Sequence, residues 1–573
     1  MARRTPLPAL LCALVLALAA GVAPAAAQTA PAAGSTTAQQ APATATDPNA
    51  LTRPERMDEP PPLRRMTGDE VLAIAERNPT VVEAREEHAP TTSSVFLKGT
   101  DRWQVSFYDR DGAEVAQVTI QDATGGVLEA WSGPQVAWTM ARGYPGAFGR
   151  KATALYVWLP LLIAFVLPFV DPRRPLRLRH LDLLMLCSLS VSLAFFSHGD
   201  IDASVPLAYP PLLYLLARLL WIAYRRGGPP APREPSRLLV PVSWLAIATI
   251  FLVGFRIGLN VTDSNVIDVG YSGVIGADKL AHGHALYGAW PQDNEHGDTY
   301  GPVNYLLYIP FEAIWPWHGT WDDLPAAHAA AVFFDLLCLA GMFLLGRRLR
   351  GNDLGVVLAY AWASFPFTLF SLATNSNDAL VAALLIGALL VATSAPARGA
   401  VAALAGLTKF APLALLPLLS THGAPPGGRL RTIGWFAAGF ALTAFVVLMP
   451  VWLQGDLQLI YDRTVGFQLG RDAPFSIWGL YDGLEIPQRI VQAAAVLFAV
   501  AAAVLPRRPG VVALAAAAGA ILLALQLGTT YWFYLYVVWV LPFAFLALLG
   551  REAEEAPPSP PEPRDARPEP VPA

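Results

Sequence analysis

The sequence predicts an α-helical polytopic membrane protein with a small α+β extracytoplasmic domain near its N-terminus. Of the 573 residues, 54% are hydrophobic and 15% are charged, whereas a soluble chain carries about 25% charged residues. Apolar runs of spanning length fill the chain from 152 to 549 and amount to about 11–13 membrane segments, counting a re-entrant pair. The segment 61–147, which precedes them, mixes polar and apolar residues as a soluble domain does.

Charge and cysteine content exclude several classes of function. The formal net charge is -4, and no run is dense enough in Lys and Arg to follow a nucleic-acid backbone. The three cysteines, Cys12, Cys187 and Cys338, lie in apolar runs and are expected to be packing residues. We therefore expect membrane lipids and neutral polar molecules as partners, and no nucleic acid.

The two ends of the chain have the composition of processing and linker segments. Two arginines, an apolar stretch and Ala25-Ala26-Ala27 predict a secretory signal peptide over 1–27, with a first membrane anchor as the alternative. Residues 28–60 are rich in Ala, Thr, Pro and Gln and predict a disordered linker. Residues 551–573 are rich in Glu and Pro and predict a disordered cytoplasmic tail.

The segment 61–147 predicts one helix followed by a small antiparallel sheet. Thr67 and Glu70 have the spacing of a capping box ahead of an amphipathic helix that ends at Asn78-Pro79. Three strand-like runs follow, at 93–98, 103–107 and 114–120. This order resembles the PepSY type of domain, which implies a regulatory or adhesive role. Without a nucleophile or metal cluster in the sequence, we expect a spacer or a partner-binding module.

The membrane segments divide into an accessory group of three at 152–224 and a larger membrane domain at 237–549. A helix needs about 20 apolar residues to cross about 30 Å of hydrocarbon. The predicted spans are 152–170, 178–197, 204–224, 237–258, 326–347, 353–371, 378–394, 431–453, 488–505, 510–527 and 530–549.

The arginines predict which ends of these spans face the cytoplasm, because short cytoplasmic loops are enriched in Lys and Arg. With an exported N-terminus, the loops alternate correctly only if two further apolar segments do not cross. Tyr300 to Trp317 is expected to lie in the interface. Segment 398–420 is expected to enter and return, broken near Lys409, because each arm spans only about 17 Å. The arginines assigned to the cytoplasm are Arg173, Arg174, Arg177, Arg179, Arg225, Arg226, Arg233, Arg237, Arg347, Arg348, Arg350, Arg398, Arg429, Arg507 and Arg508.

Polar and ionisable residues then gather on the predicted extracytoplasmic face, where we expect any chemistry to occur. The densest group follows the fourth span and contains the two candidate catalytic acids, Asp263 and Asp268. The candidates for binding a substrate on this face are Tyr271, Tyr287, Tyr300, Asn377, Asp378, Lys409, Gln468 and Arg471.

The order of these features carries a resemblance to a family. An acidic residue just beyond a span, the stretch Gly283-x-x-x-Tyr287 and then Tyr300-Gly301-Pro302 resemble the first outer loop of GT-C polytopic glycosyltransferases. The likeness is closest to the polyprenyl-phosphate-mannose-dependent mannosyltransferases and covers 237–549. It implies a sugar donor on a lipid phosphate and an Asp base at the start of this loop.

Residue by residue, the resemblance leaves one choice open. Asp268 matches the family's base, but its spacing to Tyr271 is tighter than usual, so Asp263 remains an alternative. A carboxylate must take the proton of the attacking hydroxyl, and Lys409 and Arg471 would stabilise the departing phosphate. We expect no metal and no cofactor, because a phosphomonoester leaving group does not require one.

The resulting hypothesis is an inverting glycosyltransferase in a bacterial plasma membrane. It would move a hexose or pentose from a polyprenyl phosphate to an envelope glycan or glycolipid on the outer face. Two alternatives stay open, a transporter or flippase for a lipid-linked intermediate and a non-catalytic membrane anchor. A transporter would place ionisable residues near the bilayer midplane.

Overall fold

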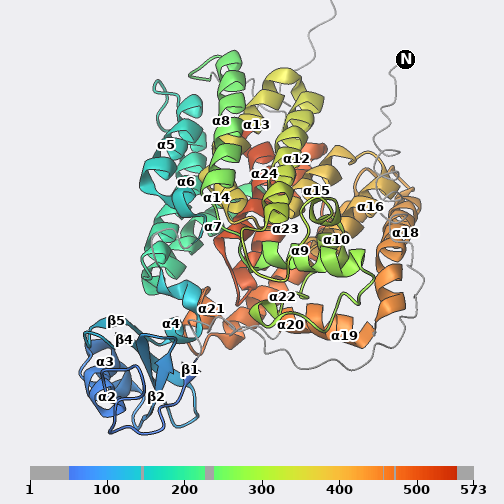
Figure 1. Ribbon diagram of the computed structural model, residues 1–573. Helices are drawn as coiled ribbons and strands as arrows, with labels where there is room; N and C mark the ends of the chain where they lie inside the picture. Colours follow the sequence, from blue (N-terminus) through green and yellow to red (C-terminus); the bar gives the residue numbers. More distant parts are fainter. Residues whose placement is uncertain (1–50, 144–147, 226–237, 456, 470–472, 551–573) are drawn as a thin grey trace, which may run out of the picture. The chain divides into compact units, whose positions relative to one another are not determined.

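The computed structural model describes residues 51–143, 148–225, 238–455, 457–469 and 473–550 (Figure 1). These residues form two compact units: residues 51–143 with 194–204, and the rest. The predicted signal peptide, most of the predicted linker, the predicted tail and Arg471 lie outside the described residues.

The smaller unit is a five-stranded antiparallel sheet in the order β1-β2-β3-β4-β5 with two main helices. Each strand pairs with its neighbour in sequence, so the sheet is a meander. Its elements are β1 Leu51–Thr52, α2 Gly68–Glu76, α3 Pro79–Glu87, β2 Thr92–Lys98, β3 Arg102–Tyr108, β4 Glu114–Gln121, β5 Val127–Ser132, α4 Pro134–Ala137 and the 3₁₀ turn Thr139–Arg142.

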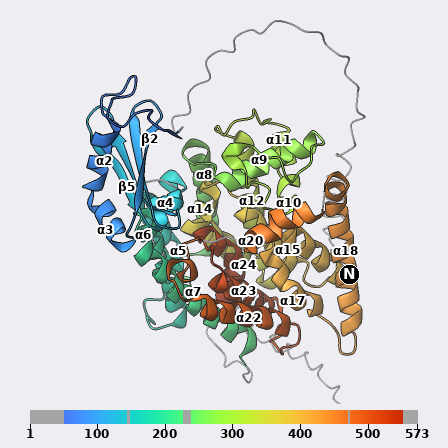
Figure 2. The same cartoon turned by 90° about the horizontal axis from the view of Figure 1, so that it is seen from below.

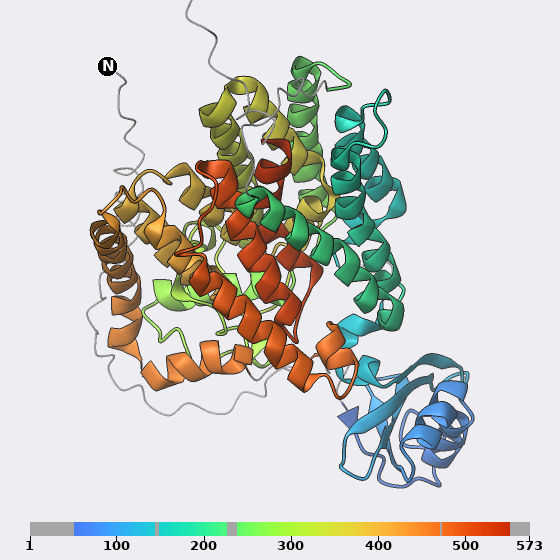
Figure 3. The same ribbon diagram turned by 180° about the vertical axis from the view of Figure 1, so that it is seen from behind.

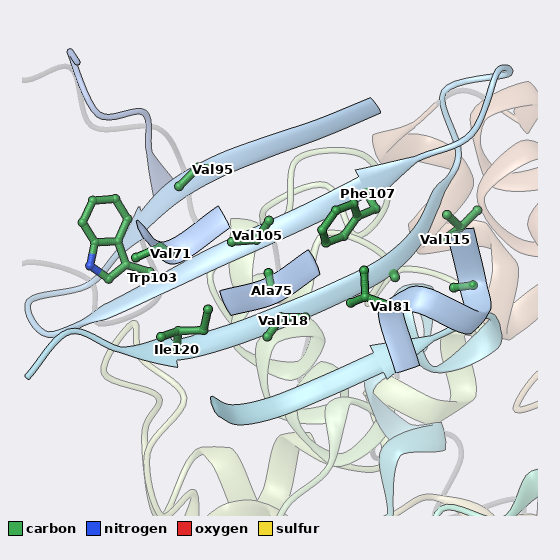
Figure 4. Close-up of a cluster of buried hydrophobic side chains, with 12 residues drawn as sticks. Val71, Ala75, Val81, Val95, Trp103, Val105, Phe107, Val115, Val118 and Ile120 are labelled. Atoms are coloured by element: carbon green, nitrogen blue, oxygen red, sulfur yellow. The ribbon is translucent and has the colours of Figure 1, made fainter. Parts of the chain in front are cut away.

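Alternation along the strands builds the core of this unit. Figure 4 shows side chains of one sheet face, Val105 and Phe107 on β3 and Val118 on β4, gathered with those of α2 and α3. Trp103 is also fully buried, and its indole N–H donates to Asp122 Oδ1 at 2.8 Å. The alternating pattern thus places one face of the sheet against the helices.

The predicted capping box is confirmed, because Thr67 accepts from the N–H of Glu70 and Glu70 accepts from the N–H of Thr67. The predicted end of the helix at Asn78-Pro79 also begins a second helix that was not predicted. Asn78 caps α3 by accepting from the N–H of Thr80 at 3.0 Å, and Pro79 occupies its first turn. The outer strands β1 and β5 were not predicted either, and β1 lies within the predicted linker.

The larger unit is helical, and every predicted span coincides with one helix or with a broken pair. The helices at these positions are α5 Leu155–Val166 with the turn Leu167–Phe169, α6 Leu178–Ser197, α7 Ile201–Tyr224, α8 Val242–Thr262, α12 Pro325–Arg350, α13 Asn352–Ser364 with α14 Pro366–Ala373, α15 Asp378–Leu390, α18 Arg429–Gln454, α22 Glu485–Ala501, α23 Val511–Gly528, and the turn Tyr534–Tyr536 with α24 Val537–Leu549.

Among the described residues, six helices are long and apolar enough to cross a membrane, and the pair α13 and α14, bent by 58°, makes a seventh. Four further apolar helices are shorter. In Figures 1, 2 and 3 the helices α23 and α24 lie in the middle of this unit and α18 at its edge. Their burial agrees, since 83% of the apolar window of α23 is buried but only 22% of that of α18.

The two segments that were predicted not to cross form no long helix. The first contains only α10 Pro302–Leu306 and α11 Ile309–Glu312. The second is α16 Ala395–Gly406, a break, the turn Ala411–Leu415 and α17 Leu416–Thr421.

The second segment folds back so that its end lies beside its start, as in a re-entrant hairpin. Arg398, near the start of α16, donates to the carbonyl of Leu419 at 3.0 Å and to that of His422 at 2.7 Å, both at the end of α17. The hairpin is therefore closed at its base by one buried guanidinium.

Arginine loops that are distant in sequence meet at the same end of the larger unit. Arg507 lies 3.0 Å from His422 Nδ1. Arg508 donates to the carbonyl of Arg225 at 3.0 Å, and Arg429 donates to the carbonyl of Ala503. The prediction that these basic loops share one face is thus consistent with their contacts.

Candidate functional site

Helix α9, Asp268–Ala281, follows α8 after a short loop and carries the candidate base at its first residue. Gly270, Gly273 and Gly276 are spaced three apart, so they lie along one face of this helix. A Cβ on Gly276 would come within 2.1 Å of the Tyr305 ring, and one on Gly270 within 2.3 Å of the carbonyl oxygen of Asn375. The small face of α9 therefore lets the neighbouring segments approach closely.

Asp268 lines a polar cavity of about 320 Å³. The wall contains Ser272 from α9, the turn around Gln292–Asn294, Tyr300 and Phe467. Asn294 donates to the backbone carbonyl of Asp268 at 3.2 Å, which fastens the turn to the start of the helix. The complete lining is Asp268, Ser272, Gln292, Asp293, Asn294, Glu295, His296, Thr299, Tyr300 and Phe467.

Asp263, the other candidate base, belongs to a different environment. It follows the last residue of α8 and forms an ion pair with Lys151. The side chain of Lys151 holds the pKa of the Asp263 carboxyl below its ordinary value. Asp263 is not among the residues that line the polar cavity, so of the two acids only Asp268 faces it.

Tyr271 and Tyr287 do not line the cavity, but each donates a hydrogen bond to a residue that does. The hydroxyl of Tyr271 donates to Asp293 Oδ2 at 3.1 Å, and its ring stacks on Trp321 with 4.8 Å between centroids. The hydroxyl of Tyr287 donates to the carbonyl of Tyr300 at 2.9 Å. Both tyrosines thus position residues of the lining.

A buried carboxylate ties the loop before Tyr300 to the segment that carries Phe467. Asp298 is fully buried, accepts from the N–H of Gly288 at 2.9 Å and lies 3.6 Å from Arg463 Nε. Burial raises the pKa of the Asp298 carboxyl above its ordinary value, and the Gly288 N–H and the Arg463 charge oppose that rise.

Lys409 lies at the break of the re-entrant hairpin and pairs with Asp378, the first residue of α15. Lys409 Nζ is 2.7 Å from Asp378 Oδ1, which also accepts from the indole N–H of Trp539 at 2.8 Å. The ammonium group is within 5.1–5.6 Å of the ring centroids of Tyr300, Tyr536 and Trp539. Tyr300 therefore contacts both the polar cavity and this buried cation.

Polar atoms beside the ion pair are incompletely hydrogen-bonded. Asn377 donates to Asn304 Oδ1 at 2.8 Å. Asn377 Oδ1, Asn304 Nδ2, Asp378 Oδ2 and the hydroxyl of Tyr308 are all buried without a hydrogen-bond partner. Buried polar atoms rarely remain unpaired, so this layer has the character of a binding or hydrated site.

The two segments predicted not to cross are joined at the site. The N–H of Gly301 donates to the carbonyl of Thr408 at 3.2 Å, and that of Val303 donates to the carbonyl of Leu407 at 3.1 Å. These bonds hold the start of α10 against the break of the hairpin and so place Tyr300 above Lys409.

Replacing Gly301 with alanine is expected to disrupt this junction, because the added Cβ would lie 1.9 Å from the carbonyl oxygen of Leu407. Overpacking of this kind costs about 1–3 kcal/mol or more. The measurement is thermal unfolding of the purified protein in detergent. Gly258→Ala on α8 is the matched control, because nothing lies within 4 Å of its added Cβ. Equal stability of the two variants would contradict the close approach.

A second cavity, of about 380 Å³, is apolar and lies between α12, α15, α16 and α18. It reaches the site through Val303 and Leu306 of α10, and through Leu380 and Leu404, which are close in sequence to Asp378 and Lys409. The segment from Tyr300 to Leu306 thus borders both cavities, the polar one through Tyr300 and the apolar one through Val303 and Leu306.

Two other buried ion pairs are helix clamps. Arg256 of α8 makes paired hydrogen bonds to Asp335 of α12, and its remaining nitrogen donates to Ala363 and Thr368. Asp335 thus forms a satisfied contact between these two helices. Arg218 of α7 pairs with Asp182 of α6 in the same manner.

The structure brings together most of the predicted site residues and adds others. Asp268 and Tyr300 line the cavity, and Asn377, Asp378 and Lys409 form the layer next to it, whereas Gln468 is exposed beside Phe467. The lining residues that sequence reasoning missed are Ser272, Gln292, Asp293, Asn294, Glu295, His296, Thr299 and Phe467. The polar run Gln292–His296 between two aromatic residues was the available signal.

Five aromatic side chains near the site are not part of the lining of the polar cavity: Trp290, Tyr305, Trp478, Tyr531 and Trp532. The indoles among them donate to Leu286, to Leu527 and to Gln526, which fixes them within the protein.

Comparison of the chain with family models, with curated proteins and with solved structures gave no match.

Proposed function

We propose that this chain is a membrane glycosyltransferase that moves a sugar from a polyprenyl phosphate to an envelope glycan or glycolipid. The observation that carries the proposal is the pairing of two cavities. One short segment, Tyr300–Leu306, borders both a polar cavity with a carboxylate and an apolar cavity, and its Tyr300 ring contacts the buried cation Lys409. A sugar joined to a lipid phosphate has parts that match this arrangement. Its polar sugar suits the polar cavity, its anionic phosphate suits the cation Lys409, and its apolar chain suits the apolar cavity.

The chemistry follows from these positions. Asp268 accepts the proton of the acceptor hydroxyl while that oxygen bonds to the anomeric carbon and the bond to the carrier phosphate breaks. This is a single displacement, so the anomeric configuration inverts. The phosphate leaves with its electron pair, and a nearby cation lowers the energy of the charge that develops on it.

Lys409 can supply that cation without leaving its partner. An ammonium group has three donors, and Asp378 occupies one of them. The aromatic rings around Nζ stabilise its charge through their negative faces. Lys409 thus has the position and the chemistry to interact with a phosphate that reaches Tyr300.

The membrane setting agrees with the arginine pattern. The loops that meet at one end of the larger unit carry Arg225, Arg429, Arg507 and Arg508, and short arginine-rich loops stay in the cytoplasm. With that end inside, α9 and the polar cavity face the outside of a bacterial plasma membrane and the C-terminal tail remains cytoplasmic.

The test is sugar transfer by the purified full chain in liposomes. Polyprenyl phosphate carrying a radiolabelled hexose or pentose is supplied with an envelope glycolipid extract as acceptor. Transfer of label from carrier to acceptor is expected, with the opposite anomeric configuration in the product. Retention of all label on the carrier with every donor would contradict the proposal.

A transporter of lipid-linked intermediates remains the second candidate, and one observation favours it. The Lys409–Asp378 pair lies at breaks in two helical segments, which is an arrangement that transporters use around their substrate sites. Movement of intact labelled carrier across the liposome bilayer, without transfer of sugar, would support this candidate instead.

A further inference from the structure

Basic side chains from three separate segments meet at one end of the larger unit. Arg429 is the first residue of α18, His422 directly follows α17, and Arg507 lies between α22 and α23. The guanidinium of Arg507 donates to His422 Nδ1 at 3.0 Å, and that of Arg429 donates to the carbonyl of Ala503. The start of α18 and the end of the re-entrant hairpin are thus both fastened to the connection that follows α22.

The groups in this cluster are poised to interact with an anion. Burial lowers the pKa of Arg507 below its ordinary value, Tyr224 opposes that change, and the charge of Arg429 adds to it. Burial and the charge of Arg507 lower the pKa of His422 to about 4, so its ring is neutral at pH 7. Because Nδ1 of that ring accepts from Arg507, its proton is on Nε2, which is a further donor. An anion bound here would relieve the repulsion between the two arginines.

The start of α18 adds a second feature that favours an anion. Arg429 begins a helix of 26 residues, and the N–H groups and the dipole at a helix N-terminus attract negative charge. The N-cap residue, Gly428, has no side chain with which to accept from those N–H groups. The helix end and the guanidinium of its first residue therefore act in the same place.

Large apolar side chains next to the two arginines indicate what kind of anion fits. Leu430 is 84% exposed, Val504 66% and Leu505 39%. Apolar side chains that are exposed at the ends of membrane helices are stabilised by contact with acyl chains. Arginines at the same level reach the phosphates of the lipid headgroups. This combination favours a phospholipid over a free phosphate ion.

We propose that Arg429, Arg507 and His422 bind the headgroup of an anionic phospholipid. Guanidinium groups donate paired hydrogen bonds to phosphate oxygens, and the acyl chains of the lipid lie against the exposed side chains of Leu430, Val504 and Leu505. The bound lipid braces the base of the hairpin that carries Lys409, because His422 ends that hairpin and its carbonyl accepts from Arg398. This site is separate from the two cavities and does not depend on the proposed function.

The test compares phosphatidylglycerol with phosphatidylcholine, which share a phosphate and differ in net charge. Binding of each fluorescent lipid, with the same acyl chains, is measured on the purified full chain in micelles of an uncharged detergent. We expect phosphatidylglycerol to bind about tenfold more tightly at low salt, with a smaller difference at high salt. Millimolar inorganic phosphate should displace little of the bound lipid.

Two variants assign the preference to this cluster. Arg429→Gln alone, which leaves the contact between Arg507 and His422 in place, should reduce the preference to about threefold, and Arg429→Gln with Arg507→Gln to about twofold or less. Arg347→Gln with Arg350→Gln, at the exposed end of α12, is the matched control and should leave it unchanged. Unchanged affinity for phosphatidylcholine shows that each variant is folded.

Three results would overturn the proposal. The first is equal affinity for the two lipids in the unaltered protein, and the second is an equal loss of preference in the cluster variants and in the control. The third is complete displacement of phosphatidylglycerol by inorganic phosphate, which would make the cluster a site for the free ion. None of these measurements uses a sugar donor, so their outcome is independent of whether sugar transfer is observed.

Discussion

Replacing Asp268 with asparagine is expected to lower kcat for sugar transfer by about 10²–10⁴-fold. Asparagine keeps the shape of the side chain but cannot accept the proton of the attacking hydroxyl. Asp268 is the first residue of α9 and lines the polar cavity, so the substitution removes the base and leaves the wall in place. The measurement is the initial rate with saturating labelled donor, so that a change in kcat is separated from a change in KM.

The matched control is Asp263→Asn. This carboxylate pairs with Lys151 away from the polar cavity, and exposed ion pairs contribute little to stability. We expect transfer within about twofold of the unaltered protein. Loss of activity in Asp263→Asn with retention in Asp268→Asn would reverse the assignment of the base.

Replacing Lys409 with methionine is expected to lower the free energy of unfolding by about 3–5 kcal/mol, because removal of one partner leaves a buried charge unpaired. The Asp378 side chain is only 1% exposed, and its second oxygen already has no hydrogen-bond partner. The measurement is unfolding of the purified protein in mixed micelles. Lys151→Met is the control and should change stability little, since Lys151 is mostly exposed.

A double variant separates structure from catalysis. Lys409→Met with Asp378→Asn removes both charges, and such paired replacements are often close to neutral in stability. We expect the double variant to recover most of the lost stability but to remain inactive in sugar transfer. Recovery of full activity would contradict a role for Lys409 in binding the phosphate.

Much of the membrane fold follows from apolar runs and arginine positions alone. Each predicted span coincides with a helix or a broken pair because a segment in hydrocarbon must satisfy its own backbone hydrogen bonds. The break near Lys409 was predictable as well, since an ionisable residue in an apolar run is costly unless it has a partner. Local signals were also sufficient for the capping box of α2.

Local signals were insufficient where pairing between segments decides the structure. Strands β1 and β5 exist because they pair with β2 and β4, and a short, largely exposed strand has no distinctive pattern of its own. Asn78-Pro79 ends one helix and begins the next, because the same capping chemistry serves both purposes.

Composition and periodicity determine that this protein is helical and lies in a membrane, because both the cost of burying polar groups and the length of a span are properties of local sequence. Which acid faces the cavity, that Lys409 pairs with Asp378, and that Gly301 meets Leu407 are decided by tertiary structure. These relations join residues from 31 to more than 100 positions apart in the chain. Asp268 and Asp263 are residues of the same type, and only their positions in the tertiary structure distinguish them: Asp268 lines the polar cavity, whereas Asp263 pairs with Lys151.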